Sequence, residues 1–150
     1  MSQREAIRMS DEELARFLDE ERVVSCASIG PDGWPHVMPL WYVVRGEELW
    51  TWTYGASQKV RNLERDPRAT LLLEAGDRYE ELRGAMFRTH AIFERDGASV
   101  AALGVALYTR YRGRVSDAVR ESVERQARKR IGIGFALSSP ATWDHRKLAT

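Results

Sequence analysis

The sequence has 150 residues, of which 43% are hydrophobic and 30% charged, and this composition is typical of one soluble globular domain with its own core. Its 23 Lys and Arg residues nearly balance its 22 Asp and Glu residues, so the net charge of +1 gives no reason to expect a nucleic acid or an anionic membrane as partner. The single Cys26 excludes an internal disulfide, and no apolar run has the length of a signal-peptide core or a membrane span, so we expect a cytoplasmic protein.

The first third of the chain predicts a short helix and then strands joined by turns. An S-x-x-E capping box begins at Ser10, and apolar residues at helical spacing follow it, which predicts a helix over residues 10–20. Small and β-branched residues then predict a strand that ends at the Pro-Asp-Gly turn of residues 31–33. A strand over residues 34–44 contains two prolines, which belong at a sheet edge, and a third strand covers residues 48–54. We expect these three strands to be antiparallel.

The rest of the chain predicts one short helix, further strands and a longer helical segment. The expected ranges are 57–66 for the helix, 68–76 and 81–96 for two strands, 98–130 for the helical segment with an interruption near 111–113, and 131–137 for a last strand. Ser57 is the expected N-cap, Pro67 ends the helix, and Gly84 marks a candidate bulge. Many strands at hairpin spacing with a few helices predict a mainly β fold, a small β-barrel with flanking helices.

One stretch, TYGASQKVRNLERDPRATLLLE at residues 53–74, is a candidate anion site. A helix start offers free N–H groups and a partial positive charge, while Lys59 adds a full charge and Ser57 a hydroxyl donor. The other interpretation is that Lys59, Arg61 and Arg65 are only a solvated helix face, which is the more frequent case for such patterns. The stretch alone does not decide between these two interpretations.

Aromatic residues concentrate just before this stretch. They are Trp34, Trp41, Tyr42, Trp50, Trp52 and Tyr54. Aromatic side chains suit strands and are buried on average, so most of them are expected in the barrel core. The alternative is a slot for a flat conjugated ring, and we expect a mixture of the two.

Other familiar sites are not indicated by the sequence. The three histidines, His36, His90 and His145, have no second ligand at metal-binding spacing, so we expect no metal site. Motifs of serine hydrolases, P-loop proteins and Rossmann proteins are missing. Residues 108–130 contain eight basic and three acidic residues, which could contact a polyanionic cofactor tail but more often form a solvated surface.

The whole pattern resembles the pyridoxamine 5'-phosphate oxidase-like family of split β-barrel flavoproteins, and within it the branch that uses flavin or the deazaflavin coenzyme F-420. The resemblance is carried by SIGPDGWPHVMPLWYVV, by the block ELWTWTYGASQKVRNLERDPRATLLLE and by TWDHRKL near the end. It covers about residues 10–95 and the tail, and K-x-R-N-L-x-R-D-P-R is its most specific part. The helical stretch 97–130 is less typical, so its role is open.

The resemblance implies a split β-barrel of the FMN-binding type over residues 1–150 and a homodimer with two cofactor sites at the subunit interface. The cofactor-binding residues that it implies are Val37, Met38, Pro39, Leu40, Trp41, Thr51, Thr53, Ser57, Lys59 and Asn62. The first seven would line the ring, and Ser57, Lys59 and Asn62 would surround the phosphate, so the resemblance favours the anion interpretation. Many relatives carry arginine at the positions of Ser57 and Gln58, which implies a differently shaped phosphate site here.

The implied activity is that of an oxidoreductase, in which hydride passes between coenzyme F-420 or FMN and a small unsaturated or carbonyl substrate. The basic residues near 108–130 favour F-420 slightly, because FMN ends at its phosphate and F-420 continues into a polyglutamate tail. No proton donor stands out among Tyr54, His36 and a His145 from the partner subunit. The alternative is a binding or carrier protein on the same barrel that holds a flavin, haem or another flat ligand without turnover.

Overall fold

The computed structural model describes residues 1–148, which form five α-helices, eight β-strands and two 3-10 helices. The helices are α1 (Gln3–Ala6), α2 (Asp11–Glu20), α3 (Gln58–Arg65), α4 (Gly97–Arg112) and α5 (Asp117–Ala127), with the 3-10 helices η1 (Tyr79–Glu81) and η2 (His145–Leu148). The strands are β1 (Val24–Ile29), β2 (Pro35–Leu40), β3 (Val43–Arg45), β4 (Glu48–Tyr54), β5 (Arg68–Ala75), β6 (Arg83–Glu94), β7 (Arg130–Ala136) and β8 (Ala141–Asp144). No helix among the described residues is long and apolar enough to cross a bilayer.

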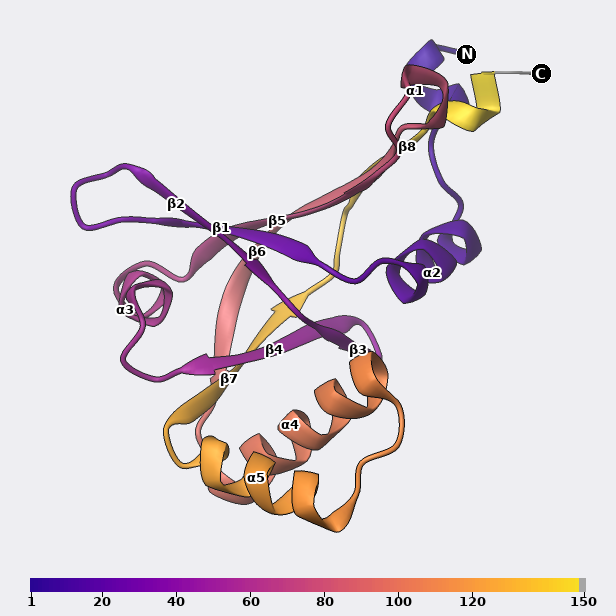
Figure 1. Ribbon diagram of the computed structural model, residues 1–150. Coiled ribbons are helices and arrows are strands. Elements are labelled where there is room, and N and C mark those ends of the chain that lie inside the picture. Colours follow the sequence, from indigo (N-terminus) through magenta and orange to yellow (C-terminus); the bar gives the residue numbers. More distant parts are fainter. Residues whose placement is uncertain (149–150) are drawn as a thin grey trace.

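The strands form one curled antiparallel sheet in the order β2-β1-β5-β6-β7-β4-β3, and β8 adds to β6 (Figure 1). The 12-residue strand β6 holds the curl together, because β5 pairs along it on one side while β8 and β7 pair with different halves of its other side. Strands β2 and β3 follow each other in the chain but lie at opposite edges of the sheet. The barrel is therefore open between them, which confirms the predicted split β-barrel.

The single strand expected over residues 34–44 is wrong, because the chain breaks at Trp41 and Tyr42 into β2 and β3. The Tyr42 ring is fully buried, and its hydroxyl donates to the main-chain oxygen of Leu18 at 2.5 Å. This anchor in α2 draws the chain away from β1, so β3 pairs with β4 instead. Both prolines of the expected strand lie in β2, at the sheet edge where they were predicted.

The candidate bulge at Gly84 is also wrong, since the register passes through it unbroken from Glu74 on β5 to Trp143 on β8. The glycine is required for another reason. The Trp143 ring lies directly over it, and an added Cβ would overlap the ring carbons. Strand β8 itself was not expected, because its partner is distant in the sequence.

The inside of the curled sheet forms the main core, which α2 and α3 complete with Phe17, Leu18, Val60 and Leu63. A second, smaller core lies under α4, where Val43, Leu103 and Leu107 pack with Trp50 and Trp52. Helices α4 and α5 lie side by side along β4 and β7 (Figure 1). The expected helical segment is interrupted where predicted, at Gly113, whose φ of 80° ends α4.

Local helix signals agree with the structure. The capping box at Ser10 is present, and the Ser57 hydroxyl accepts a hydrogen bond from the Val60 N–H, as expected of an N-cap. The aromatic residues divide as predicted, because Tyr42 is fully buried while Trp34 is 75% exposed. The structure therefore assigns some aromatics to the core and leaves others on the surface.

Candidate functional site

The start of α3 has the properties of an anion site. Ser57 caps the helix, and the first turn contains no acidic residue. The N–H groups of this eight-residue helix therefore present their partial positive charge without a carboxylate to neutralise it. The Ser57 N–H bonds the Tyr54 carbonyl, so the helix start is fixed to the end of β4.

Lys59 is the charged group of this site. Its ammonium donates to the Thr53 hydroxyl at 2.8 Å, so two of the residues predicted for the site meet. Burial lowers the pKa of Lys59, nearby Arg130 lowers it further, and no carboxylate of residues 1–148 forms an ion pair with it. A half-buried cation without an acid is costly, and a bound anion would remove that cost.

Asn62 lies one turn further along α3 and is fully buried. Its amide donates to the Ser28 hydroxyl on β1 at 3.1 Å, and its oxygen accepts from the Gln58 amide at 2.8 Å. The bond to Ser28 fastens α3 to β1. Asn62 thus fixes where the helix start and Lys59 lie, and its own polar groups already have partners.

Strand β2 runs along the open edge of the sheet and pairs with β1, the strand that α3 contacts. Cross-strand partners share a face, so Met38, opposite Cys26, faces the same side as Cys26. Burial raises the pKa of the Cys26 thiol to about 11, and the charge of Lys59 lowers it slightly. A thiol with this pKa is protonated at neutral pH and is no nucleophile. Met38 is 42% exposed, although it is apolar.

The other residues predicted on β2 divide between the two faces of the sheet. Val37 and Pro39 pair with Ala27 and Ser25, which places their side chains on the face opposite Met38. Leu40 is half-buried and packs against the main core. The main chain of the whole strand therefore lies at the open edge. Of the predicted side chains, Met38 and Leu40 face the inside of the curled sheet, whereas Val37 and Pro39 face outward.

Trp41 ends the predicted ring-binding segment. The Thr51 hydroxyl donates to its main-chain oxygen at 2.8 Å, so another predicted pair meets. Its indole stacks on Tyr111 of α4, with ring centroids 4.3 Å apart and planes 4° apart, and it remains 44% exposed. The helical segment whose role the sequence left open therefore supports the candidate site.

Sequence reasoning did not single out Tyr111, which stacks on Trp41, or Arg130, which lies on the α4 face of β4. The Tyr111 hydroxyl lies between β1 and the break after β2, because it accepts from the Tyr42 N–H at 2.9 Å and contacts the Arg22 carbonyl oxygen at 2.8 Å. Arg130 stands over the rings of Tyr54 and Trp52, 4.3 Å and 4.7 Å from their centroids. The basic character of residues 108–130 was a signal for both residues, but their contacts depend on long-range pairing.

The three candidate proton donors lie in different places. Tyr54 is 56% exposed beside the start of α3, and His36 shares its face with Ser28, with a buried Nδ1 that has no partner. His145 begins η2 at the C-terminal end and contacts the Tyr79 carbonyl at 2.7 Å. Within one chain η2 lies far from α3 (Figure 1). Only Tyr54 and His36 of one chain therefore lie near Lys59 and Asn62.

A family model described as pyridoxamine 5'-phosphate oxidase matches residues 10–137. A conserved hypothetical protein from Mycobacterium tuberculosis is 39% identical, with a TM-score of 0.91 over 100% of this chain and 94% of that one. No curated protein matches the sequence.

Two more distant structures show the fold alone. An F-420 reductase is 22% identical, with a TM-score of 0.64 over 83% of this chain and 93% of that chain. The haem storage protein HutZ from Vibrio cholerae is 16% identical, with a TM-score of 0.68 over 89% of this chain and 93% of that chain. The barrel that surrounds the candidate site is thus shared with proteins named for a deazaflavin and for haem.

Proposed function

The chain belongs to the pyridoxamine 5'-phosphate oxidase family, and from that premise we propose that it is an oxidoreductase that uses coenzyme F-420 or FMN with a small unsaturated or carbonyl substrate. The observation that carries the proposal is Lys59, a half-buried ammonium at the capped start of α3 that forms no ion pair with a carboxylate of residues 1–148. A phosphate-bearing cofactor fits this donor set, because it would accept from Lys59, from Ser57 and from the free N–H groups of the helix.

The chain's own residues would bind and orient the cofactor. Lys59 and Ser57 would hold the phosphate, and Asn62 would fix α3 through Ser28. The unpaired edge of β2 offers main-chain groups to a ring, and Trp41, held by Thr51, would close one end of it. The ring, when bound, supplies the hydride chemistry, while the protein positions it and limits access of water. F-420 is slightly favoured because residues 108–130 are rich in basic side chains, which would suit its polyglutamate tail.

The alternative is a non-catalytic carrier of a flavin, haem or another flat ligand, as the name of the haem storage protein suggests. A carrier encloses its ligand, whereas hydride transfer needs an open ring face for the substrate. The exposure of Met38 and Trp41 favours catalysis, because both leave apolar surface free beside the proposed ring position. Single-turnover oxidation of the reduced cofactor by quinones and enones tests this choice, and a protein that binds tightly but never turns over would be a carrier.

We also propose a homodimer. The outer face of the sheet carries exposed Val37, Leu72 and Met86, and the last two are cross-strand partners. A hollow of about 880 Å³ opens on this face beside Met86, and its lining within the described part of the chain includes Arg68, Arg88 and His90 but no carboxylate. A second copy would cover the apolar stripe and place the cofactor between subunits. Light scattering checks it: Met86→Glu should give monomers from wild-type dimers, and a wild-type monomer contradicts the proposal.

The experiment that tests the cofactor site is a titration with FMN and with F-420, followed by cofactor fluorescence. Lys59→Ala should raise Kd about 10- to 100-fold, since a hydrogen bond to a charged group contributes about 1.5–3 kcal/mol. Arg61→Ala is the matched control, because it removes the same charge from an exposed position of the same helix. Equal effects of the two substitutions would remove Lys59 from the site, and binding of neither cofactor would contradict the proposed function.

A further inference from the structure

The hollow on the outer face of the sheet is separate from the candidate phosphate site at the start of α3. Its lining includes neither Ser57 nor Lys59. Residues of β1, β5 and β6 form its floor, while Pro35 at the start of β2 and the loop between β7 and β8 also border it. The hollow is therefore a second candidate binding surface, on the face where the second copy is proposed to dock.

Arg88 supplies the uncompensated charge of this hollow. Cross-strand pairing of Arg68 with His90 and of Thr70 with Arg88 brings the three basic side chains to one face. The Arg68 guanidinium is already used, since it donates to the Asp66 carboxylate at 2.7 Å. Arg88 forms no ion pair within residues 1–148. Its N–H donors are therefore available for an oxyanion, and one guanidinium matches a monoanion such as a carboxylate.

The loop between β7 and β8 adds hydroxyl groups to the hollow. Ser138 and Ser139 both line it. Ser139 has a φ of 49° and is the one non-glycine residue with a positive φ in the described part of the chain. Such a conformation is costly for a residue with a side chain, and it occurs preferentially at binding sites. Because Ala141 pairs with Met86 on β6, the loop is held beside the hollow.

The hollow lies next to the edge strand along which the cofactor ring is proposed to bind. Ala27 lines the hollow, and its register partner is Val37, one of the residues predicted to line the ring. Pro35 also lines the hollow and lies on the same face of β2 as Val37, two residues or about 7 Å away. A small molecule with its anionic end in the hollow would therefore have its other end beside the proposed ring position.

We propose that this hollow is the substrate site and that Arg88 binds a carboxylate of the substrate. The inference rests on the proposed function and deepens it, because it narrows the small unsaturated or carbonyl substrate to an acid. The apolar side chains of Ile29, Pro35 and Met86 line the same hollow and would contact the hydrocarbon part of the substrate. The proposed second copy would roof the hollow and exclude water from it. No part of the cofactor is assigned to Arg88.

The test compares trans-4-oxo-2-pentenoate, an enone with a carboxylate, with its methyl ester, which lacks the charge. Reduction of either compound adds one hydride and one proton across the C=C bond and oxidises the reduced cofactor. Arg88→Gln should raise KM for the acid about tenfold, as expected for one charge-assisted contact, and change KM for the ester less than about twofold. Arg45→Gln is the matched control, because Arg45 is exposed on β3 at an edge of the sheet. The proposal is overturned if Arg88→Gln affects acid and ester alike, or if it behaves like the control.

Failure of the proposed function gives a different result, which is that wild-type protein binds neither cofactor or reduces neither compound. The anion site is then decided by binding alone, without a cofactor. In wild-type protein the acid should shift the ring C–H resonances of His90, one of three histidines in the sequence, and the ester should not. Arg88→Gln should raise the Kd of the acid about tenfold in this titration. Unmoved His90 resonances in wild-type protein would overturn the assignment of Arg88 independently of any turnover.

Discussion

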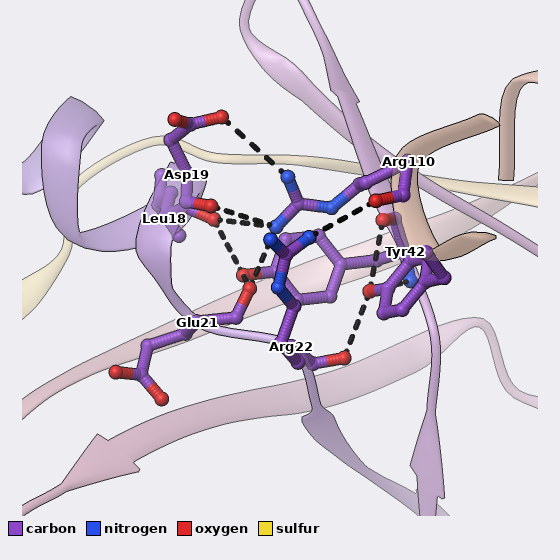
Figure 2. Close-up of polar contacts among 7 residues, drawn as sticks. Leu18, Asp19, Glu21, Arg22, Tyr42 and Arg110 are labelled. Atoms are coloured by element: carbon purple, nitrogen blue, oxygen red, sulfur yellow. Dashed lines mark hydrogen bonds and ion pairs between the residues drawn. The ribbon is translucent and has the colours of Figure 1, made fainter. Parts of the chain in front are cut away.

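Two arginines of the same segment show how similar surroundings lead to different roles. Arg110 at the end of α4 lies over the rings of Tyr42 and Tyr111, and Arg130 lies over two other rings. Arg110, however, donates to the main-chain oxygens of Leu18 at 3.1 Å and Glu21 at 2.6 Å (Figure 2). Arg130 makes no such bond among the described residues. Aromatic anchoring alone therefore does not distinguish the two; what differs is whether the outer donors are already used.

The Arg110 cluster replaces a helix cap that the local sequence lacks. Helix α2 has no basic residue in its last turn, so its terminal carbonyls need partners from elsewhere. Arg110 supplies them across the fold and also pairs with Asp19, while the Tyr42 hydroxyl bonds the Leu18 and Glu21 carbonyls from below. The Arg22 guanidinium in turn donates a hydrogen bond to the Arg110 carbonyl oxygen (Figure 2). This cluster joins α2, α4 and the break after β2, so its function is structural.

The largest expected effect is on stability and separates the two arginines. Arg110→Met should lower the free energy of unfolding by about 3 kcal/mol, because it removes the charged donor of the Leu18 and Glu21 carbonyls and leaves them only the single hydroxyl of Tyr42. Arg130→Met should change it by less than about 1 kcal/mol, because the lost ring contacts are offset by relief of repulsion with Lys59. Urea unfolding measures both values, and Arg114→Met is the exposed control. Equal losses of unfolding free energy in Arg110→Met and Arg130→Met would show that the two arginines do not differ in role.

The next largest effect on stability concerns the packing of α4 against the Trp52 ring, which Arg130 contacts on β7. Gly104 of α4 lies against the Trp52 ring, and an added Cβ would overlap that ring and come within 2.7 Å of Val123. Gly104→Ala should therefore destabilise by about 1–2 kcal/mol, since overpacking outweighs the gain of about 1 kcal/mol in helix propensity. Gly97→Ala, with nothing near its Cβ, keeps the propensity gain and serves as control in the same helix. A stabilised Gly104→Ala would show that Trp52 moves freely.

A smaller loss of stability is expected at Tyr111, which contacts both Trp41 and Tyr42. Tyr111→Phe keeps the stack on Trp41 but removes the hydroxyl that accepts from the Tyr42 N–H. The hydroxyl also donates to the Arg22 carbonyl oxygen, so the loss should be about 1–2 kcal/mol, as expected for two intramolecular hydrogen bonds. Tyr111→Leu should lose about 1 kcal/mol more, because the ring contact goes as well. Urea unfolding of the two variants separates the contribution of the hydroxyl from that of the ring stack. Wild-type stability in Tyr111→Phe would mean that water replaces the hydroxyl.

The fold could be predicted where local chemistry determines it. The capping box at Ser10, the cap at Ser57 and the prolines of the edge strand act within a few residues, and the structure agrees with each of them. The break at Trp41 and Tyr42 could not be predicted, because it depends on carbonyls of α2 that the Tyr42 hydroxyl reaches. Strand β8 was missed for the same reason, since only its pairing with the distant β6 defines it.

The residues of the candidate site also differ in how far the sequence alone predicts them. Lys59 is recognisable from its place in the first turn of a capped helix, and its contact with Thr53 follows from the short connection between β4 and α3. Tyr111 reaches Trp41 only through the packing of α4, and Arg130 reaches Tyr54 only through the pairing of β7 with β4. A basic segment in the sequence indicates that such residues exist, but not which of them lack an acid. That distinction needs the folded chain, as the contrast with Arg110 shows.

The smallest expected effect is the pH dependence of cofactor affinity. The pKa of Lys59 is lowered mainly by burial, so the free protein loses this proton below the ordinary value of 10.5. A bound anion favours the charged form, so the complex retains the proton to higher pH and affinity must fall as pH rises through the lowered pKa of the free site. At pH 9 the loss should stay below tenfold, about 1.4 kcal/mol. Fluorescence titrations from pH 7 to 10 measure it. Lys59→Arg keeps its charge throughout and should remove the decline, whereas a decline shared by both proteins would place the titrating group elsewhere.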